Sequence, residues 1–264
     1  MDIKLGEVQK TMLIPLTVKA NETLRKKPRI KDEKAVEIIR SIDTDISKYD
    51  KFMSHEGIVA RTIMFDKTLN EYIKHYPNAV LVNLGCGLDN RFKRVDNGKI
   101  LWYNLDLPDA IELRKRFFND NNRVHTMAAS VFDKFWMKEI PQNRKIIFIA
   151  EGLLMYFSRE QIQEILQNMA SYFSDFIFVT ELMAPFTSKM SKHHDTVKNT
   201  NASFGWGTKT GHDLEALCPG LKLITENSFN VEMKKYTIRG KLFASIPFIK
   251  EFNNRLAVFK YTKP

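Results

Sequence analysis

Residues 79–91 have the sequence AVLVNLGCGLDNR. The first part is an uninterrupted apolar run, which predicts a buried parallel strand. The glycines that follow, Gly85 and Gly87, predict a turn in which backbone N–H groups can approach a ligand. A second apolar run, residues 101–106, ends in an acid about 20 residues further on. The carboxylate of Asp106 can therefore accept hydrogen bonds from both hydroxyls of a ribose, and the stretch predicts half of a nucleotide-binding α/β unit.

From residue 79 onward, short apolar runs alternate with amphipathic segments, which is typical of a mostly parallel sheet. The apolar runs predict strands at residues 79–84, 100–105, 123–128, 145–150 and 175–181. The amphipathic segments predict helices at residues 89–95, 108–119, 134–139 and 159–173. Two later runs predict antiparallel edge strands, at about residues 221–226 and 255–260.

The first 78 residues are predicted to form a helical cap on the α/β domain, which spans residues 79–264. One helix is predicted around residues 31–40, with Asp32 near its N-terminus. A second is predicted from about residue 58 to residue 75, because Pro77 disfavours helix in the residue before it.

Two further features predict local structure. Ser158 and Gln161 have the spacing of a capping box, in which each side chain bonds the other's backbone N–H at the start of a helix. Residues 185–215 are polar and contain no clear strand, and a run of that length in a compact domain is usually a functional loop or lid. A short helix is predicted within and just after it, at residues 213–217.

The composition favours a protein with a large core in a reducing compartment. Hydrophobic residues make up 44% of the 264 residues, and neither an 18-residue apolar run nor a signal-peptide pattern is present. The two cysteines are far apart and have no metal-ligand spacing, so we expect a cytoplasmic protein without a metal site. The net charge of +10 is scattered and not interleaved with aromatic residues, so we expect neither a nucleic-acid nor a membrane partner.

The details of the glycine turn favour one class of ligand. A dinucleotide fingerprint needs a third glycine, but Asn90 stands in its place, and Asp89 would repel a pyrophosphate. No Gly-Lys-Ser/Thr follows, so the turn is not a P-loop. A ligand with ribose and adenine but no phosphate fits better, and S-adenosylmethionine is the common one. Its ammonium and sulfonium need acids nearby, and its carboxylate needs a base. Asp106, Ser130-Val131 and Glu151 follow three successive predicted strands and can supply part of this set.

The chain resembles the leucine carboxyl methyltransferase family, especially its bacterial branch of tetracenomycin-type polyketide O-methyltransferases. Two motifs together make the resemblance specific: G-x-G-L-D-x-R at residues 85–91 and A-E-G-x-x-x-Y at residues 150–156. Further matching segments are residues 16–20, 59–62, 106–108, 129–133 and 204–207. Lys19 stands where many relatives have arginine, and Ser130 where some have aspartate.

The resemblance implies a Rossmann-like class I methyltransferase with a seven-stranded, mostly parallel sheet, helices on both faces, an N-terminal helical cap and a lid insertion. It implies that Arg61 binds the carboxylate of S-adenosylmethionine, and that Glu151 lines the methionine end near the transferable methyl group. The remaining implied cofactor contacts are Gly85, Cys86 and Gly87 at the methionine moiety, Asp106 and Leu107 at the ribose, and Ser130 and Val131 at the adenine.

The methyl acceptor is the least constrained part of the site. Tyr156, Trp206 and Lys19 are predicted to bind it. A carboxylate acceptor needs no general base, whereas a hydroxyl does, and candidate bases are His193, His194 and His212. We therefore assign no catalytic base. A small-molecule acceptor is the preferred hypothesis. The alternatives are a protein C-terminal carboxylate, a basic RNA-binding or RNA-modifying protein on the same fold, and an inactive cofactor sensor.

Overall fold

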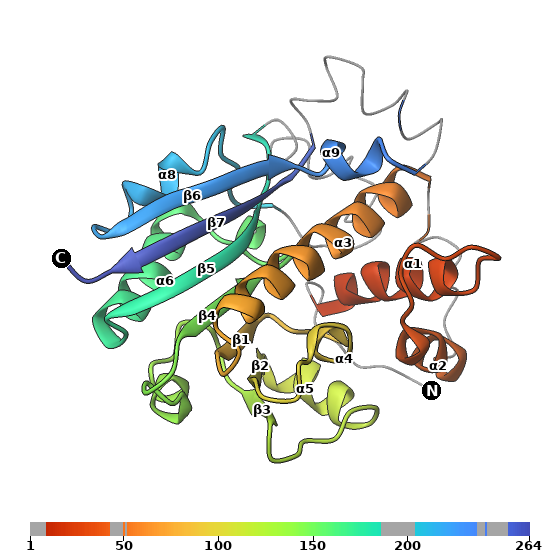
Figure 1. The fold of residues 1–264 in the computed structure, drawn as a ribbon, viewed down its shortest axis with the longest axis horizontal. Helices are drawn as coiled ribbons and strands as arrows, with labels where there is room; N and C mark the ends of the chain where they lie inside the picture. Colours follow the sequence, from red (N-terminus) through yellow and green to blue (C-terminus); the bar gives the residue numbers. More distant parts are fainter. Residues whose placement is uncertain (1–8, 43–49, 51, 186–203, 237–240, 242–252) are drawn as a thin grey trace.

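The computed structural model describes residues 9–42, 50, 52–185, 204–236, 241 and 253–264. Within this part of the chain, seven strands form one sheet with the order β3-β2-β1-β4-β5-β7-β6 (Figure 1). The strands are β1 Val80–Leu84, β2 Leu101–Asp106, β3 Val124–Ala128, β4 Ile146–Ala150, β5 Asp175–Leu182, β6 Leu221–Ser228 and β7 Arg255–Thr262. The first five are parallel, and β7 runs antiparallel to both β5 and β6. The predicted Rossmann-like class I methyltransferase fold is confirmed.

One detail of the sheet differs from the prediction. Both C-terminal strands were expected at the edge, but only β6 is an edge strand, because β7 inserts between β5 and β6. The burial of the two strands reflects this. Leu256, Ala257, Val258 and Phe259 of β7 are all buried, whereas β6 alternates buried or half-buried residues with exposed ones. A strand with a neighbour on each side and helices on both faces needs such an apolar run.

Helices cover both faces of the sheet because successive strand residues point to opposite sides. In β4, Ile146, Phe148 and Ala150 pack on one face, whereas Ile147 and Ile149 pack on the other. Figure 1 shows α3 lying across one face, while α6 lies behind the opposite one. The described helices are η1 Gln9–Met12, α1 Leu13–Thr23, α2 Glu33–Ser41, α3 Phe52–His75, α4 Arg91–Val95, α5 Pro108–Lys115, η3 Phe135–Glu139, η4 Leu154–Tyr156, α6 Arg159–Tyr172, α8 His212–Glu215 and α9 Asn230–Met233.

Local signals fixed several helix ends. The capping box of Ser158 and Gln161 is present, and Asp32 caps α2 by accepting a hydrogen bond from the backbone N–H of Ala35 at 3.1 Å. Other bounds differ from the predictions. The α3 helix begins six residues earlier than predicted, at Phe52, and α5 ends at Lys115. Residues 135–139 form a 3-10 helix.

The α3 helix joins the N-terminal helices to the sheet. The α1 and α2 helices pack on each other and on Leu88 and Leu113 beside the glycine turn. The first half of α3 packs on α1, and its second half contributes Phe65, Leu69 and Ile73 to the core on the sheet. The predicted domain boundary at residue 78 stays a prediction. Of the predicted lid, residues 186–203 lie outside the described residues. None of the described helices is long and apolar enough to cross a membrane.

The strand order places the site. The β1 strand pairs with β2 on one side and with β4 on the other, so the chain leaves the sheet in opposite directions from neighbouring strands. Ligands bind at such a switch point, beyond the carboxyl ends of the strands. The glycine turn, Asp106 and Glu151 follow or end these three strands.

Candidate active site

The turn after β1 is shaped by its glycines. Gly85 and Gly87 have φ angles of +64° and +47°, in the left-handed region that other residues rarely adopt. A Cβ atom at Gly85 would lie 2.8 Å from Cδ1 of Leu153, and one at Gly87 would lie 3.3 Å from Cβ of Met12. The turn therefore lies against η1 and the segment after β4. Cys86 between the glycines is buried, so its backbone is what a ligand can reach.

Asp106 fastens this turn to the end of β2. Its Oδ2 accepts a hydrogen bond from the backbone N–H of Gly87 at 2.7 Å, and its Oδ1 accepts one from that of Leu107 at 2.8 Å. Burial raises the pKa of Asp106 above its ordinary value. Each carboxylate oxygen keeps a second lone pair for a ligand hydroxyl. Leu107 is 39% exposed, which is unusual for so apolar a side chain and suits a residue that covers a ligand.

Arg61 of α3 lies between two carboxylates. Its Nη1 donates to Glu181 Oε2 at 3.0 Å, and its Nε lies 2.8 Å from Glu151 Oε1. The Nε–H is nevertheless buried without a hydrogen-bond acceptor, because it is not directed at that oxygen. Burial alone would raise the pKa of Glu151, but the positive charges of Arg91 and Arg61 outweigh it and hold the pKa below its usual range. Glu151 is therefore ionised at neutral pH.

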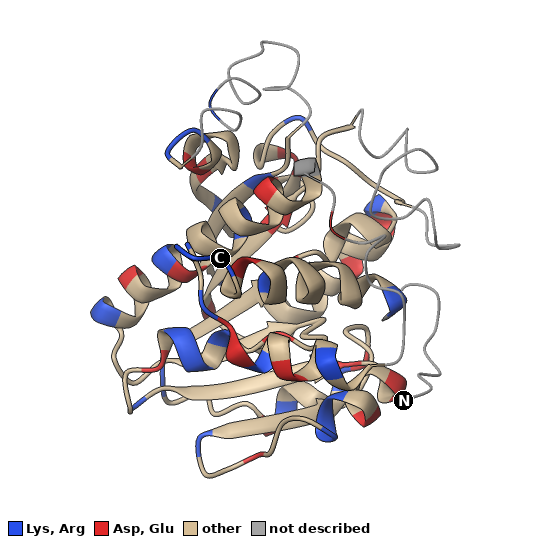
Figure 2. Ribbon diagram, turned by 90° about the vertical axis from the view of Figure 1, so that its right-hand side faces the viewer, with Lys and Arg blue, Asp and Glu red and all other residues tan. Residues whose placement is uncertain are grey.

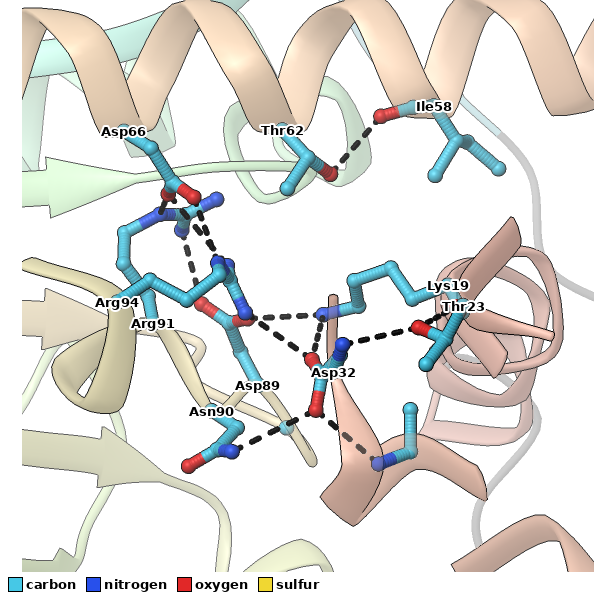
Figure 3. Close-up of polar contacts among 12 residues, drawn as sticks. Lys19, Thr23, Asp32, Ile58, Thr62, Asp66, Asp89, Asn90, Arg91 and Arg94 are labelled. Atoms are coloured by element: carbon cyan, nitrogen blue, oxygen red, sulfur yellow. Dashed lines mark hydrogen bonds and ion pairs between the residues drawn. The ribbon is translucent and has the colours of Figure 1, made fainter. Parts of the chain in front are cut away.

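Arg91 joins Glu151 to a larger ion-pair network. Figure 3 shows Arg91 with Asp66, Asp89 and Arg94 of this network. Its guanidinium is 1% exposed and contacts three carboxylates: Asp66 at 2.7 Å, Asp89 at 2.8 Å and Glu151 at 2.5 Å. Arg94, one helical turn further on, pairs with Asp66 at 2.6 Å. The network thus connects α3, the glycine turn, α4 and the end of β4.

Lys19 belongs to this network. Its ammonium lies 2.8 Å from Asp89 Oδ1 and 3.9 Å from Asp32, and its side chain is 5% exposed (Figure 3). Both partners are carboxylates of the protein itself, so the structure places Lys19 beneath the glycine turn. The predicted substrate contact of Lys19 is untested and competes with this structural role.

The segment after β3 forms a compact turn. The backbone N–H of Ser130 donates to Asp133 Oδ2 at 2.9 Å, and the hydroxyl of Ser130 accepts from the backbone N–H of Phe132 at 3.3 Å. Val131 is buried. The Ser130 hydroxyl hydrogen remains free to donate, as contact with an adenine nitrogen would require.

An apolar cluster lies beside the Arg61 carboxylate pair. Tyr156 packs with Met155, Met183 and Phe204, and its ring centroid lies 5.6 Å from that of Phe204. The Tyr156 hydroxyl donates to Thr11 Oγ1 at 3.0 Å. The pKa of Tyr156 is raised, chiefly by burial. This cluster contains the predicted acceptor contact Tyr156 and adds three residues that the sequence analysis did not assign.

Trp206 is held by the close backbone approach of its two neighbouring glycines. A Cβ atom at Gly205 would lie 2.7 Å from the carbonyl oxygen of Phe157, and one at Gly207 would lie 2.8 Å from that of Ala184. Residues 204–208 are thereby fixed against η4 and the end of β5. Trp206 is partly buried against the sheet core, and its predicted role as a wall of the acceptor pocket stays a prediction.

Of the three candidate bases, His212 lies in the part of the chain that the structure describes. His212 is exposed and pairs with Glu215 of its own helix at 2.9 Å. His193 and His194 lie outside the described residues.

Comparison with known proteins identifies the family. The model of the leucine carboxyl methyltransferase family matches residues 14–170. The chain belongs to this family. It is 31% identical over 222 residues to the tetracenomycin polyketide synthesis O-methyltransferase TcmP of Streptomyces glaucescens, an alignment that covers 83% of this chain and 82% of that protein. It is 21% identical over 244 residues to the S-adenosyl-L-methionine-dependent methyltransferase dpfgK of Gibberella zeae, with coverage of 83% and 82%.

Solved structures support the fold. A putative methyltransferase from Thermobifida fusca superimposes with a TM-score of 0.60 at 11% identity, covering 94% of each chain. A duf574 family protein from Streptomyces avermitilis superimposes with a TM-score of 0.61 at 10% identity, covering 97% of each. As a member of the leucine carboxyl methyltransferase family, the chain is a methyltransferase that uses S-adenosylmethionine.

The residues at the carboxyl ends of the strands fit this cofactor. The unaccepted Nε–H of Arg61 provides a buried donor for a carboxylate, and the carboxylate of Glu151 beside it suits the neighbouring ammonium and sulfonium. Asp106 suits the ribose, and the left-handed glycines leave the backbone open to close approach.

Sequence reasoning missed one central residue of this site. Glu181 near the end of β5 contacts Arg61 as closely as Glu151 does, yet it was not assigned. An acid at the end of an apolar strand was the signal used for Asp106 and Glu151, and the segment FIFVTEL carries the same signal.

Proposed function

We propose that this methyltransferase transfers a methyl group to a carboxylate or hydroxyl oxygen of a small molecule. The similarity to the polyketide O-methyltransferase of Streptomyces glaucescens supports oxygen as the acceptor atom, since it spans most of both chains. The observation that carries the proposal is the apolar cluster of Met155, Tyr156, Met183 and Phe204 beside the Arg61 carboxylate pair. An aromatic or aliphatic acceptor would pack there, next to the methionine end of the cofactor.

The chain's own residues would divide the work as follows. Arg61 binds the carboxylate of the cofactor, Glu151 faces its positive groups, and Asp106 accepts from the ribose hydroxyls. S-adenosylmethionine supplies a methyl carbon on a sulfonium, which is already activated for displacement. The protein's contribution is therefore mainly to position the acceptor oxygen in line with that carbon and to exclude water. The apolar cluster serves both purposes.

The protonation state of the acceptor decides whether a base is needed. A carboxylate is ionised at neutral pH and can attack directly, whereas a phenol or alcohol must lose a proton. Tyr156 is a poor base at neutral pH, because burial raises its pKa and keeps its proton on the oxygen. Its hydroxyl, held by Thr11, would orient the acceptor instead.

Calorimetric titration with S-adenosylhomocysteine, with NAD as the negative control, tests the cofactor site. Binding of the former alone is the expected result. A panel of matched aromatic carboxylic acids and phenols, with S-adenosylhomocysteine formation as the readout, then tests the acceptor. Methylation of a compound from either class supports the proposal. Binding without turnover across the whole panel would contradict it and favour the cofactor-sensing alternative.

A protein C-terminal carboxylate is the second candidate, because the matched family is described by leucine carboxyl methylation. A peptide that ends in leucine and its C-terminal amide are the appropriate pair of substrates. Methylation of the free acid alone would favour this candidate over the small molecule.

Neither nucleic acid nor a membrane is part of the proposal. Figure 2 shows Lys and Arg positions interleaved with Asp and Glu positions along the described ribbon, without a continuous run of basic positions. We propose a cytoplasmic location, which the buried, unpaired thiols of Cys86 and Cys218 support. Cell fractionation tests it, and recovery with the membrane or secreted fraction would contradict it.

A further inference from the structure

Glu181 is a buried carboxylate with three fixed donors. Its side chain is 2% exposed. One oxygen, Oε2, accepts from Arg61 Nη1 at 3.0 Å and from the backbone N–H of Gly152 at 2.9 Å. The other, Oε1, accepts from the amide of Asn254 at 2.6 Å. A carboxylate with these three donors is poorly placed to take a proton from the methyl acceptor. Glu181 would therefore affect the reaction by positioning Arg61 and Gly152.

Those groups belong to the cofactor site. Arg61 is the proposed partner of the cofactor's carboxylate. Gly152 directly follows Glu151 and has a φ angle of +65°. The hydrogen bond from its N–H to Glu181 fixes this left-handed turn beside Glu151. A single oxygen atom of Glu181 therefore fixes both the position of the Arg61 guanidinium and the turn at Gly152.

We propose that Glu181 is a positioning residue that keeps Arg61 available to the carboxylate of S-adenosylmethionine. This inference rests on the proposed role of Arg61. Glu181 holds Nη1 and thereby fixes the orientation of the guanidinium, in which the Nε–H lies 2.8 Å from Glu151 Oε1 without being directed at that oxygen, and so can donate to a ligand. Without Glu181, the buried guanidinium of Arg61 would keep only Glu151 as a charged partner. It would then turn to direct its N–H groups at Glu151, because an unpaired buried charge is costly, and the Nε–H would no longer be available to the cofactor.

Two variants of Glu181 distinguish the effect of its negative charge from the effect of its hydrogen bonds. Glu181→Gln keeps an oxygen acceptor for Gly152, and Asn254 can turn its own carbonyl toward the new amide. Glu181→Ala removes every contact. We expect Gln to weaken S-adenosylhomocysteine binding about ten-fold, because the hydrogen bond from Arg61 loses its charged acceptor, and Ala to weaken it further, because the acceptor itself is lost.

The decisive measurement is calorimetric titration of each variant with two ligands. One is S-adenosylhomocysteine, and the other is its analogue without the amino-acid carboxylate. For Glu181→Gln, which keeps the acceptor for Gly152, we expect a loss of affinity for the first ligand only. In an Arg61→Met background, Glu181→Gln should cause no further loss, because the two residues act as one unit. Glu232→Gln is the matched control: Glu232 is a buried acid that pairs with Lys67, and its removal should affect neither ligand.

The outcomes are distinguishable. Equal losses for both ligands, or additive losses in the double variant, would overturn the positioning role and leave Glu181 as support for the fold. A wild-type protein that binds neither ligand would instead overturn the cofactor site as a whole. If the Glu181 variants do not fold, Asn254→Ala removes only the Oε1 contact, and the same selective but smaller loss is expected. A non-selective loss there would also overturn the proposal.

Discussion

The guanidinium of Arg91, at the start of α4, lies 2.5 Å from the carboxylate of Glu151, which follows β4. The same guanidinium holds Asp89 of the glycine turn and Asp66 of α3. One buried cation therefore ties three separate segments of the chain to the residue that is proposed to face the cofactor's positive groups. One ion-pair network therefore connects the site to α3 and α4.

Replacing this cation should be costly. Arg91→Met leaves three carboxylates without their shared partner, and removing one member of a buried ion-pair network typically costs about 3–5 kcal/mol. Urea unfolding at neutral pH measures the change in the free energy of unfolding. Arg116→Met is the control, because Arg116 forms only an exposed pair with Glu112. A loss for Arg91→Met as small as that of the control would show that the network contributes little to stability.

The pH dependence of stability has a testable contribution from Glu22. Burial alone would raise the pKa of this carboxyl, but hydrogen bonds from Arg29 and His55 outweigh it and lower the pKa from 4.5 to about 2. Because the folded-state pKa lies below the unfolded one, the contribution to stability is complete above the unfolded value. It is lost as the pH falls from about 4.5 to about 2.

Glu22→Gln should therefore destabilise the protein at neutral pH and have a smaller effect as the pH falls. Thermal unfolding of both proteins, from neutral pH down to the lowest pH at which the wild type shows an unfolding transition, measures the difference. If the difference in melting temperature did not change with pH, the ionisation of Glu22 would not contribute to stability.

A test of the ribose contact proposed for Asp106 must allow for the hydrogen bonds by which Asp106 holds the glycine turn. Asp106→Ala should weaken S-adenosylhomocysteine binding by roughly 1–3 kcal/mol, because ribose hydroxyls lose a charged acceptor. It should also lower the melting temperature, since the backbone N–H groups of Gly87 and Leu107 lose theirs. Calorimetry below the melting transition separates the two effects. Unchanged affinity would exclude Asp106 from the ribose site.

Gly207→Ala tests whether the close approach beneath Trp206 shapes the acceptor pocket. The new Cβ atom would lie 2.8 Å from the carbonyl oxygen of Ala184, so the backbone must move. We expect a loss of about 1–3 kcal/mol in stability and weaker acceptor binding with cofactor affinity unchanged. Gly57→Ala, in α3 with no atom within 4 Å of the new Cβ, should be neutral or stabilise by up to about 1 kcal/mol. If cofactor affinity fell as well, the segment would belong to the cofactor site.

The sequence alone predicted the parallel part of the sheet, because its strands are short apolar runs with breaks between them. It also predicted the glycine turn, Asp106 and Glu151, which are local signals at strand ends. It did not place β7 inside the sheet, since that depends on pairing between β5 and β7, segments about 80 residues apart. The partners of Arg61 were missed for the same reason: Glu181 lies 120 positions away along the chain.

The partner of Lys19 is also distant along the chain and could not be predicted from the sequence. Family resemblance predicts a substrate contact, whereas the structure pairs its ammonium with Asp89, 70 positions away. Lys19→Met should cost about 1–3 kcal/mol of stability, because Asp89 keeps Arg91 and Arg94 but loses one charged donor. The Michaelis constant for the acceptor should stay unchanged. A raised Michaelis constant with normal stability would restore the substrate role, because a residue that only supports the glycine turn cannot change acceptor binding without changing the fold.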